Sequence, residues 1–167
     1  MQFCNHKINY LPEHTSRLPL EFVLGLLNSK LADWYFRLGS TNAAVSHYQI
    51  YNLPCPVFEA IDANRASESE KVRRLIRSRR MLDAFEALSG SLVTSPFSIL
   101  LQDAVVEAVT QIIDIEAERG EIRRVDRSAL DPHAQPYQDF IDRLFYAMAG
   151  ISDGEARGLE ERLARMQ

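Results

Sequence analysis

Side chains of the types that contact DNA are concentrated between Lys30 and Tyr51. Lys30 and Arg37 offer positive charges for phosphates. Short hydroxyl and amide side chains bond phosphate oxygens or base edges, and glutamine pairs well with adenine. The polar and aromatic candidates in this stretch are Ser40, Thr41, Asn42, His47, Tyr48, Gln49 and Tyr51. The stretch predicts a DNA contact, with an ordinary helix–turn–strand that has an exposed polar face as the alternative interpretation.

A second cationic group lies between residues 71 and 80, the densest basic run of the chain. It includes Lys71, Arg73, Arg74, Arg77, Arg79 and Arg80. On a helix these side chains fall on the side away from apolar residues such as Val72 and Leu75. Arg73, Arg77 and Arg80 are candidate phosphate contacts, and a solvated helix face is the more common meaning of such a run.

Motifs for catalysis and metal binding are missing from the sequence. It contains no P-loop, no HExxH helix and no grouping of carboxylates with a lysine that would indicate a nuclease. Cys4, His6, His47 and Cys55 could be imagined as zinc ligands, but their spacing is not a standard one. Two buried thiols and two surface histidines are the simpler interpretation. We therefore expect no cofactor and no metal ion in this chain, and enzymatic activity stays uncertain.

A helix over residues 19–38 must position the first cationic group. Pro19 suits the first helical position and Gly39 suits the residue past the end. The apolar residues recur every three or four positions, as one buried helix face requires. They are Leu20, Val23, Leu24, Leu27, Leu31, Trp34, Tyr35 and Leu38.

Two short strands are expected to flank this helix. Residues 44–51 alternate with a period of two, and Pro54 and Pro56 then prevent a central strand from continuing. Residues 1–12 also show a strand-like pattern. Two strands do not form a stable sheet alone, so we expect them to add to a sheet from preceding sequence. The chain is therefore predicted to begin within a domain, as a strand–helix–strand unit over residues 1–58.

Helices dominate the rest of the chain, residues 59–167. A capping box at Ser67–Glu70 opens a helix that ends near Gly90, and Pro96 opens a second that ends at Gly120. A third begins at Pro136 and ends at Gly150, and a capping box at Ser152–Glu155 opens the last. Short connections favour antiparallel packing. The predicted fold class is α+β, mainly α, with a small N-terminal strand–helix–strand unit and an antiparallel helical tail.

Composition narrows the functional classes. The 167 residues carry a net charge of −4, which argues against a DNA-binding domain that acts alone. It leaves room for a segment whose partner domain supplies a positive cleft. Two cysteines make no disulfide framework, and neither a signal peptide nor a membrane-spanning run is visible. We expect a cytoplasmic protein that does not associate with a membrane.

Two segments resemble a known family. FVLGLLNSKLADWYFR over residues 22–37, followed by LPCP over residues 53–56, is similar to the "LLxxLNSKL" helix and "LPxP" close of a target-recognition domain. That domain belongs to TaqI-like restriction–modification enzymes, which methylate adenine in DNA. DFIDRLFYAMAGISDGE over residues 139–155 is similar to their "IDxLVYxLYGLTxEE" tail. The two matches occur in the order that the family has.

The resemblance implies a C-terminal target-recognition segment of such a methyltransferase. The Gly-rich cofactor loop and the Asn-Pro-Pro-Tyr/Phe tetrapeptide of these enzymes are not in this sequence. A catalytic domain or subunit outside this chain would use S-adenosylmethionine to methylate a flipped adenine. The expected partners are double-stranded DNA and that methyltransferase or endonuclease domain, and a homo-oligomer is an open alternative. The alternative function is a helical protein–protein interaction module without nucleic acid, and a decayed gene remnant is a third.

Overall fold

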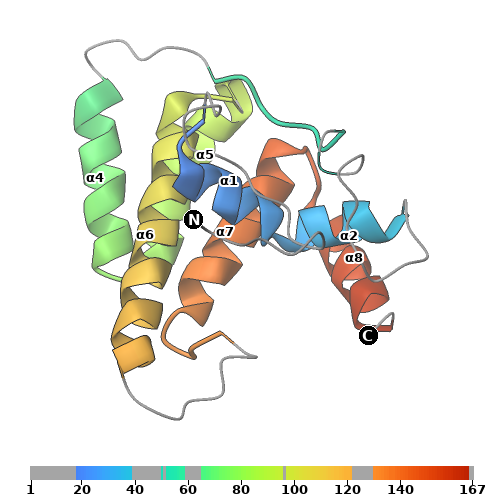
Figure 1. Cartoon of the computed structure of the whole chain (residues 1–167). Helices are drawn as coiled ribbons and strands as arrows, with labels where there is room; N and C mark the ends of the chain where they lie inside the picture. Colours follow the sequence, from blue (N-terminus) through green and yellow to red (C-terminus); the bar gives the residue numbers. More distant parts are fainter. Residues whose placement is uncertain are drawn as a thin grey trace, which may run out of the picture.

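The structure, a computed structural model, describes residues 18–38, 50, 52–58, 65–95, 97–121 and 130–165 (Figure 1). Most of these residues belong to seven helices. They are α1 (Leu20–Leu27), α2 (Lys30–Leu38), α4 (Arg65–Arg77), α5 (Met81–Thr94), α6 (Ile99–Glu121), α7 (Gln135–Met148) and α8 (Asp153–Arg165).

The predicted α+β fold class is wrong, because the described part of the chain is all-helical and contains no strand. Both expected strands, 1–12 and 44–51, lie outside the described residues except for Ile50, which is helical. Alternation of apolar and polar residues stabilises a strand only where a second strand pairs with it. The described helices instead bury their apolar faces against one another.

The predicted helix over residues 19–38 is two helices, broken at Asn28 and Ser29. Asn28 leaves the helical conformation at φ −94° and ψ 2°. The Ser29 hydroxyl donates to the Leu26 carbonyl at 2.7 Å and accepts the Ala32 N–H at 3.2 Å, so it caps α2. The break allows α1 and α2 to bury faces that point in different directions.

The predicted helix that starts near Ser67 is also two helices, α4 and α5, separated at residues 78–80. Arg79 has φ 59°, in the left-handed region. Its N–H donates to Ile76 O and the Arg80 N–H donates to Leu75 O, both at 2.9 Å. These two bonds form a Schellman motif, which ends α4 although the left-handed residue is not glycine. Gly90, expected at the helix end, lies inside α5.

The last two predicted helices are confirmed. Gly150 follows α7 with φ 71°, and its N–H and that of Ile151 make the same Schellman pair of bonds. Ser152 and Glu155 form the predicted capping box, with the Ser152 N–H 2.9 Å from Glu155 Oε2 and the Glu155 N–H 3.4 Å from Ser152 Oγ.

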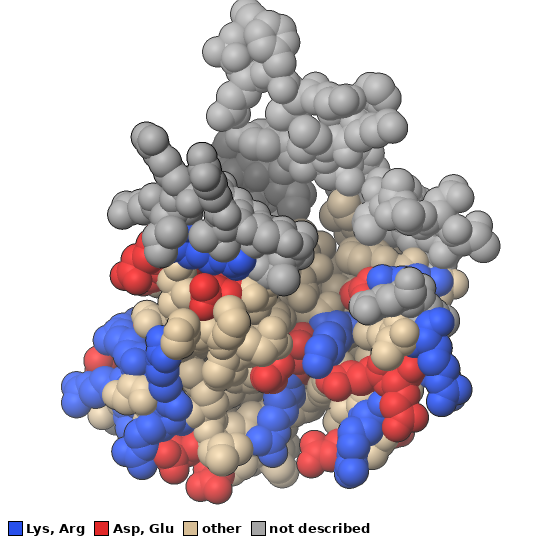
Figure 2. All heavy atoms as spheres, turned by 90° about the horizontal axis from the view of Figure 1, so that it is seen from below, with Lys and Arg blue, Asp and Glu red and all other residues tan. Residues whose placement is uncertain are grey.

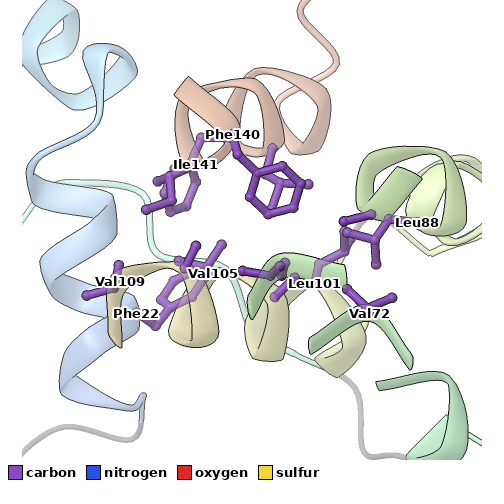
Figure 3. Close-up of a cluster of buried hydrophobic side chains, with 14 of the residues drawn as sticks. Phe22, Val72, Leu88, Leu101, Val105, Val109, Phe140 and Ile141 are labelled. Carbon is purple, nitrogen blue, oxygen red and sulfur yellow. The ribbon is translucent and has the colours of Figure 1, made fainter. Parts of the chain in front are cut away.

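One core joins the helices, with α6 at its centre (Figure 3). Phe22 of α1 is fully buried and makes edge contacts with Phe58 at 5.0 Å and Phe145 at 5.6 Å between ring centroids. α1 lies so close to α6 that a Cβ on Gly25 would be 2.9 Å from Val109 Cγ2. A boundary between units at residue 58 stays a prediction, and described residues on both sides of it share this core.

A smaller cluster attaches α8. Tyr146, Ala156, Leu159 and Leu163 are buried together, and Leu31 and Trp34 of α2 pack against them. α2 therefore packs against both α7 and α8, on the side of the molecule away from α4 (Figure 1).

Candidate functional site

The junction between α1 and α2 is held by Asp142 of α7. The backbone N–H of Lys30 donates to Asp142 Oδ1 at 2.8 Å. The Asp142 residue is 2% exposed, and its Oδ2 is buried without a hydrogen-bond partner. Lys30 Nζ lies 3.9 Å from Oδ2. A buried carboxylate thus receives the first N–H of α2, where the helix dipole favours negative charge.

Burial of Asp142 raises the pKa of its carboxyl group. Removal from water raises the pKa of this carboxyl to about 6, although the Lys30 N–H, the Lys30 charge and Gln138 lower it. The neighbouring charge of Asp139 adds a small upward effect. A carboxyl with this pKa is partly protonated in mildly acidic solution, which an exposed aspartate is not.

Lys30 is part of an ion-pair network between helices. Its Nζ lies 3.0 Å from Glu160 Oε1 of α8, and Tyr146 Oη lies 3.3 Å from the same oxygen. Burial lowers the pKa of Lys30, but Glu160 and Asp142 raise it more, so that its pKa is above the ordinary value. Lys30, predicted as a phosphate contact, joins α2 to α7 and α8 in this structure.

Arg37 lies in the last turn of α2. Its Nε is 2.8 Å from Asp33 Oδ1, an exposed pair one helical turn apart. The other predicted contacts of this stretch lie outside the described residues. They are Ser40, Thr41, Asn42, His47, Tyr48, Gln49 and Tyr51.

The predicted arginines of the second cationic group are paired with carboxylates. Arg73 lies 3.0 Å from Asp103 of α6, and Arg80 lies 2.7 Å from Asp83. Arg77 is bidentate to Glu107 of α6, at 2.9 and 2.8 Å. The hydrogen bond and the charge of Glu107 raise the pKa of Arg77. Because the Glu107 side chain is only 9% exposed, Arg77 neutralises a buried carboxylate and ties α4 to α6.

Four other side chains form what we call the outer face of α4. They are Ser67, Lys71, Arg74 and Ser78, of which Lys71 and Arg74 are cations. Lys71 is exposed, and the Arg74 side chain is 74% exposed with Glu70 at 3.2 Å. A shallow hollow of about 550 Å³ runs along this face and also touches Arg80. Lys and Arg predominate on the left of the molecule in Figure 2, the side on which Figure 1 places α4.

An apolar groove of about 430 Å³ opens on the opposite side of the molecule. It lies between α2, the end of α7 and the segment Leu53–Pro56, and Trp34, Phe97 and Met148 line it. Cys55 also lines the groove and is exposed, so the expectation that its thiol is buried is wrong, although partial removal from water raises the pKa of that thiol. Of the other imagined zinc ligands, Cys4, His6 and His47 lie outside the described residues. Within the described ranges no group of histidines, cysteines and carboxylates could hold a metal ion.

The spacing of four, three and four residues in the outer face of α4 could have been read from the sequence. The inward pairing of Arg73 and Arg77 could not, because their partners lie on another helix.

Comparisons with known proteins give no relative. No protein-family model, no curated protein and no solved structure matches the chain. None of the helices in the described ranges combines the length and the apolar character that a membrane crossing needs.

Proposed function

We propose that this chain is a DNA-docking, target-recognition C-terminal segment of a cytoplasmic adenine-specific DNA methyltransferase of the restriction–modification type. Its catalytic domain, with S-adenosylmethionine, would lie outside this sequence. The observation that carries the proposal is the contact between Lys30 and Asp142. It joins the two segments on which the family resemblance rests, although they are 112 residues apart.

The residues that make this contact are the ones that the resemblance depends on. Asn28, Ser29 and Lys30 are the central letters of "LNSKL", and Asp142 is the aspartate of "IDxL". Ser29 caps α2, the Lys30 N–H bonds Asp142, and Gln138 Nε2 lies 3.4 Å from the Asn28 carbonyl. A chance match of two unrelated amphipathic helices gives no reason for these residues to meet. Their meeting supports the view that the two segments form one unit.

The same junction gives Lys30 and Asp142 a role in the proposed activity. They fix where α2 starts and how it lies against α7 and α8. α2 ends at Leu38 and leads into residues 39–51, which hold most of the predicted base contacts. We therefore assign Lys30 to positioning, and Arg37 with Tyr48 and Gln49 to DNA contact.

Binding of the whole chain to a fluorescein-labelled 20-base-pair duplex tests the proposal. We expect fluorescence anisotropy to show binding at 50 mM NaCl that weakens steeply by 200 mM NaCl. The triple variant Arg37→Glu, Tyr48→Ala and Gln49→Ala should bind at least about tenfold more weakly, since each phosphate or base contact is worth a measurable part of the affinity. Arg162→Glu, a charge reversal in the last turn of α8, is the control and should change affinity less than twofold. Equal loss in both variants would reject a localised site.

The apolar groove favours a second candidate function, a protein–protein interaction module. Exposed apolar patches and grooves are typical of sites that bind a protein partner. In this case, peptides selected for binding to the chain would change the fluorescence of Trp34. Their affinity would fall at least about tenfold with Met148→Lys, and the chain would not bind the duplex at 50 mM NaCl.

A further inference from the structure

We infer that the outer face of α4, with the turn Arg79–Arg80 that follows it, contacts the phosphate backbone of double-stranded DNA. The inference rests on the proposed function and adds a second contact surface, on a helix outside the segments that resemble the family. It also replaces Arg73 and Arg77 of the sequence prediction with a different set of cations.

The geometry of the outer face fits a row of phosphates. Ser67, Lys71, Arg74 and Ser78 are spaced by four, three and four residues, so they share one side of α4. At 1.5 Å per residue the row is about 16 Å long, which is the rise of about five phosphates along one DNA strand. Two hydroxyls and two cations along the hollow are suitable donors to phosphate oxygens.

The cations of α4 divide into two sets with different environments. Arg73 and Arg77 face α6, where Asp103 and Glu107 neutralise them. The Arg74 side chain is twice as exposed as that of Arg73, at 74% against 35%. Packing of α4 on α6 therefore accounts for Arg73 and Arg77. It does not account for the positive charges of Lys71 and Arg74.

Carboxylates lie beside the outer face and limit its positive charge, and one of them, Glu70, also lines the hollow. Glu70 lies 3.2 Å from Arg74 and 3.6 Å from Arg77, and Asp83 pairs with Arg80. Lys71, in the middle of α4, and Arg79, after its C-terminal end, add positive charge. The surface remains positive within a chain whose net charge is −4, and this local charge is what selects a polyanion as the partner.

The conformation of Arg79, in the turn after α4, also supports a contact with DNA at this surface. It occupies the left-handed position of a Schellman motif with φ 59°, whereas Gly150 occupies that position in the equivalent motif after α7. A side chain there strains the backbone, and glycine does not. The Arg79 side chain is exposed, so core packing does not account for an arginine at this place. The Arg79 side chain adds a positive charge between Ser78 and Arg80, which both line the hollow. A contact with an anion at the hollow would account for an arginine at this position.

The experiment measures binding of the full chain to a fluorescein-labelled 20-base-pair duplex of random sequence between 50 and 300 mM NaCl. Lys71→Gln with Arg74→Gln should weaken binding at least about tenfold at 100 mM NaCl and reduce the slope of log affinity against log salt by about 2. The control, Arg157→Gln with Arg162→Gln on α8, makes the same change in net charge. It should leave affinity within about twofold of the unchanged chain.

Arg79→Gly separates binding from folding. Relief of the strained position should raise the Tm by about 2–4 °C, while the loss of one cation should reduce the salt slope by about 1. A variant that is more stable and yet binds DNA more weakly cannot owe its weaker binding to unfolding.

The outcomes distinguish the inference from the proposed function. If the unchanged chain binds with a steep salt dependence and the Lys71 and Arg74 variant binds equally well, the α4 surface is wrong and the proposed function stands. If the unchanged chain does not bind the duplex at 50 mM NaCl, both are overturned. A lower Tm for Arg79→Gly would overturn the argument from strain.

Discussion

Replacing Asp142 by asparagine should stabilise the protein at neutral pH. Asp142 is a 2% exposed carboxylate with one unpartnered oxygen, and it receives the Lys30 N–H at 2.8 Å. The amide oxygen of an asparagine can accept that same bond. The substitution removes the buried charge and keeps the acceptor and the shape, but it puts an amide donor in the place of Oδ2, 3.9 Å from Lys30 Nζ, which offsets part of the gain. Lys30 Nζ loses only its 3.9 Å neighbour and keeps Glu160 at 3.0 Å.

The magnitude follows from the pKa of Asp142. Burial raises this pKa to about 6 in the folded chain. In the unfolded chain an aspartate has a pKa of about 3.9, so the shift is about two units, or on the order of 3 kcal/mol at about 1.4 kcal/mol per unit. Since the folded pKa is the higher one, the stability from the protonated form is fully present below about pH 4 and is lost as the pH rises through about 6. The D142N variant has no such loss.

Urea unfolding at pH 4, 5, 6 and 7 measures the effect, with the fluorescence of Trp34, the single tryptophan, as the signal. D142N should exceed the unchanged chain by up to about 3 kcal/mol at pH 7, and the difference should vanish near pH 4. Asp139→Asn, an exposed aspartate on the same helix, is the control and should change stability by less than about 0.5 kcal/mol. A D142N variant that is less stable at pH 7, or a difference that does not change with pH, would refute the reasoning.

Three further substitutions test the packing. Gly25→Val should cost about 2–3 kcal/mol in urea unfolding, because even a Cβ added there would be 2.9 Å from Val109 Cγ2, and an unchanged stability would show that α1 and α6 can separate. Arg77→Ala should cost about 1–2 kcal/mol by leaving the Glu107 carboxylate without its cation and with only the hydrogen bond from Gln111 Nε2, and adding Glu107→Gln should recover part of the loss in a double-mutant cycle. Ser29→Ala removes the cap of α2 and should cost about 1 kcal/mol, with faster amide hydrogen exchange confined to the first turn of α2; uniform acceleration across α2 would contradict a local cap.

The sequence was sufficient to predict helices whose ends have local signals. The aromatic and aliphatic spacing after Pro136, Gly150 at the left-handed position and the capping box at Ser152 all act within a few residues. α7 and the start of α8 were therefore predicted nearly to the residue.

The breaks inside the two longest predicted helices lack such signals. The apolar spacing continues through Ser29, and the acceptor that completes the break, Asp142, is 112 residues away from Lys30. At the second break, Arg79 adopts a conformation that favours glycine, so its residue type gives no warning.

In the candidate site too, local features could be predicted and contacts with distant residues could not. Sequence identified the cations of α4, but the distinction between paired and outward arginines depends on Asp103 and Glu107 of α6. The strand expected over residues 44–51 relied on alternation alone, and alternation does not supply the partner strand that it requires.

The contact between Lys30 and Asp142 has a consequence for biosynthesis. α1 and α2 leave the ribosome before α7 has been made, and at about 5–20 residues per second the 112 residues between them take roughly 6–20 s. During that interval Phe22 and Leu26 have no α7 to pack against, although both are buried in the finished protein. α4, α5 and α6 are neighbours along the chain and can associate first. The core around α1 is therefore completed only when α7 has been made, although α6 precedes α7 along the chain and can already cover the Gly25 side of α1.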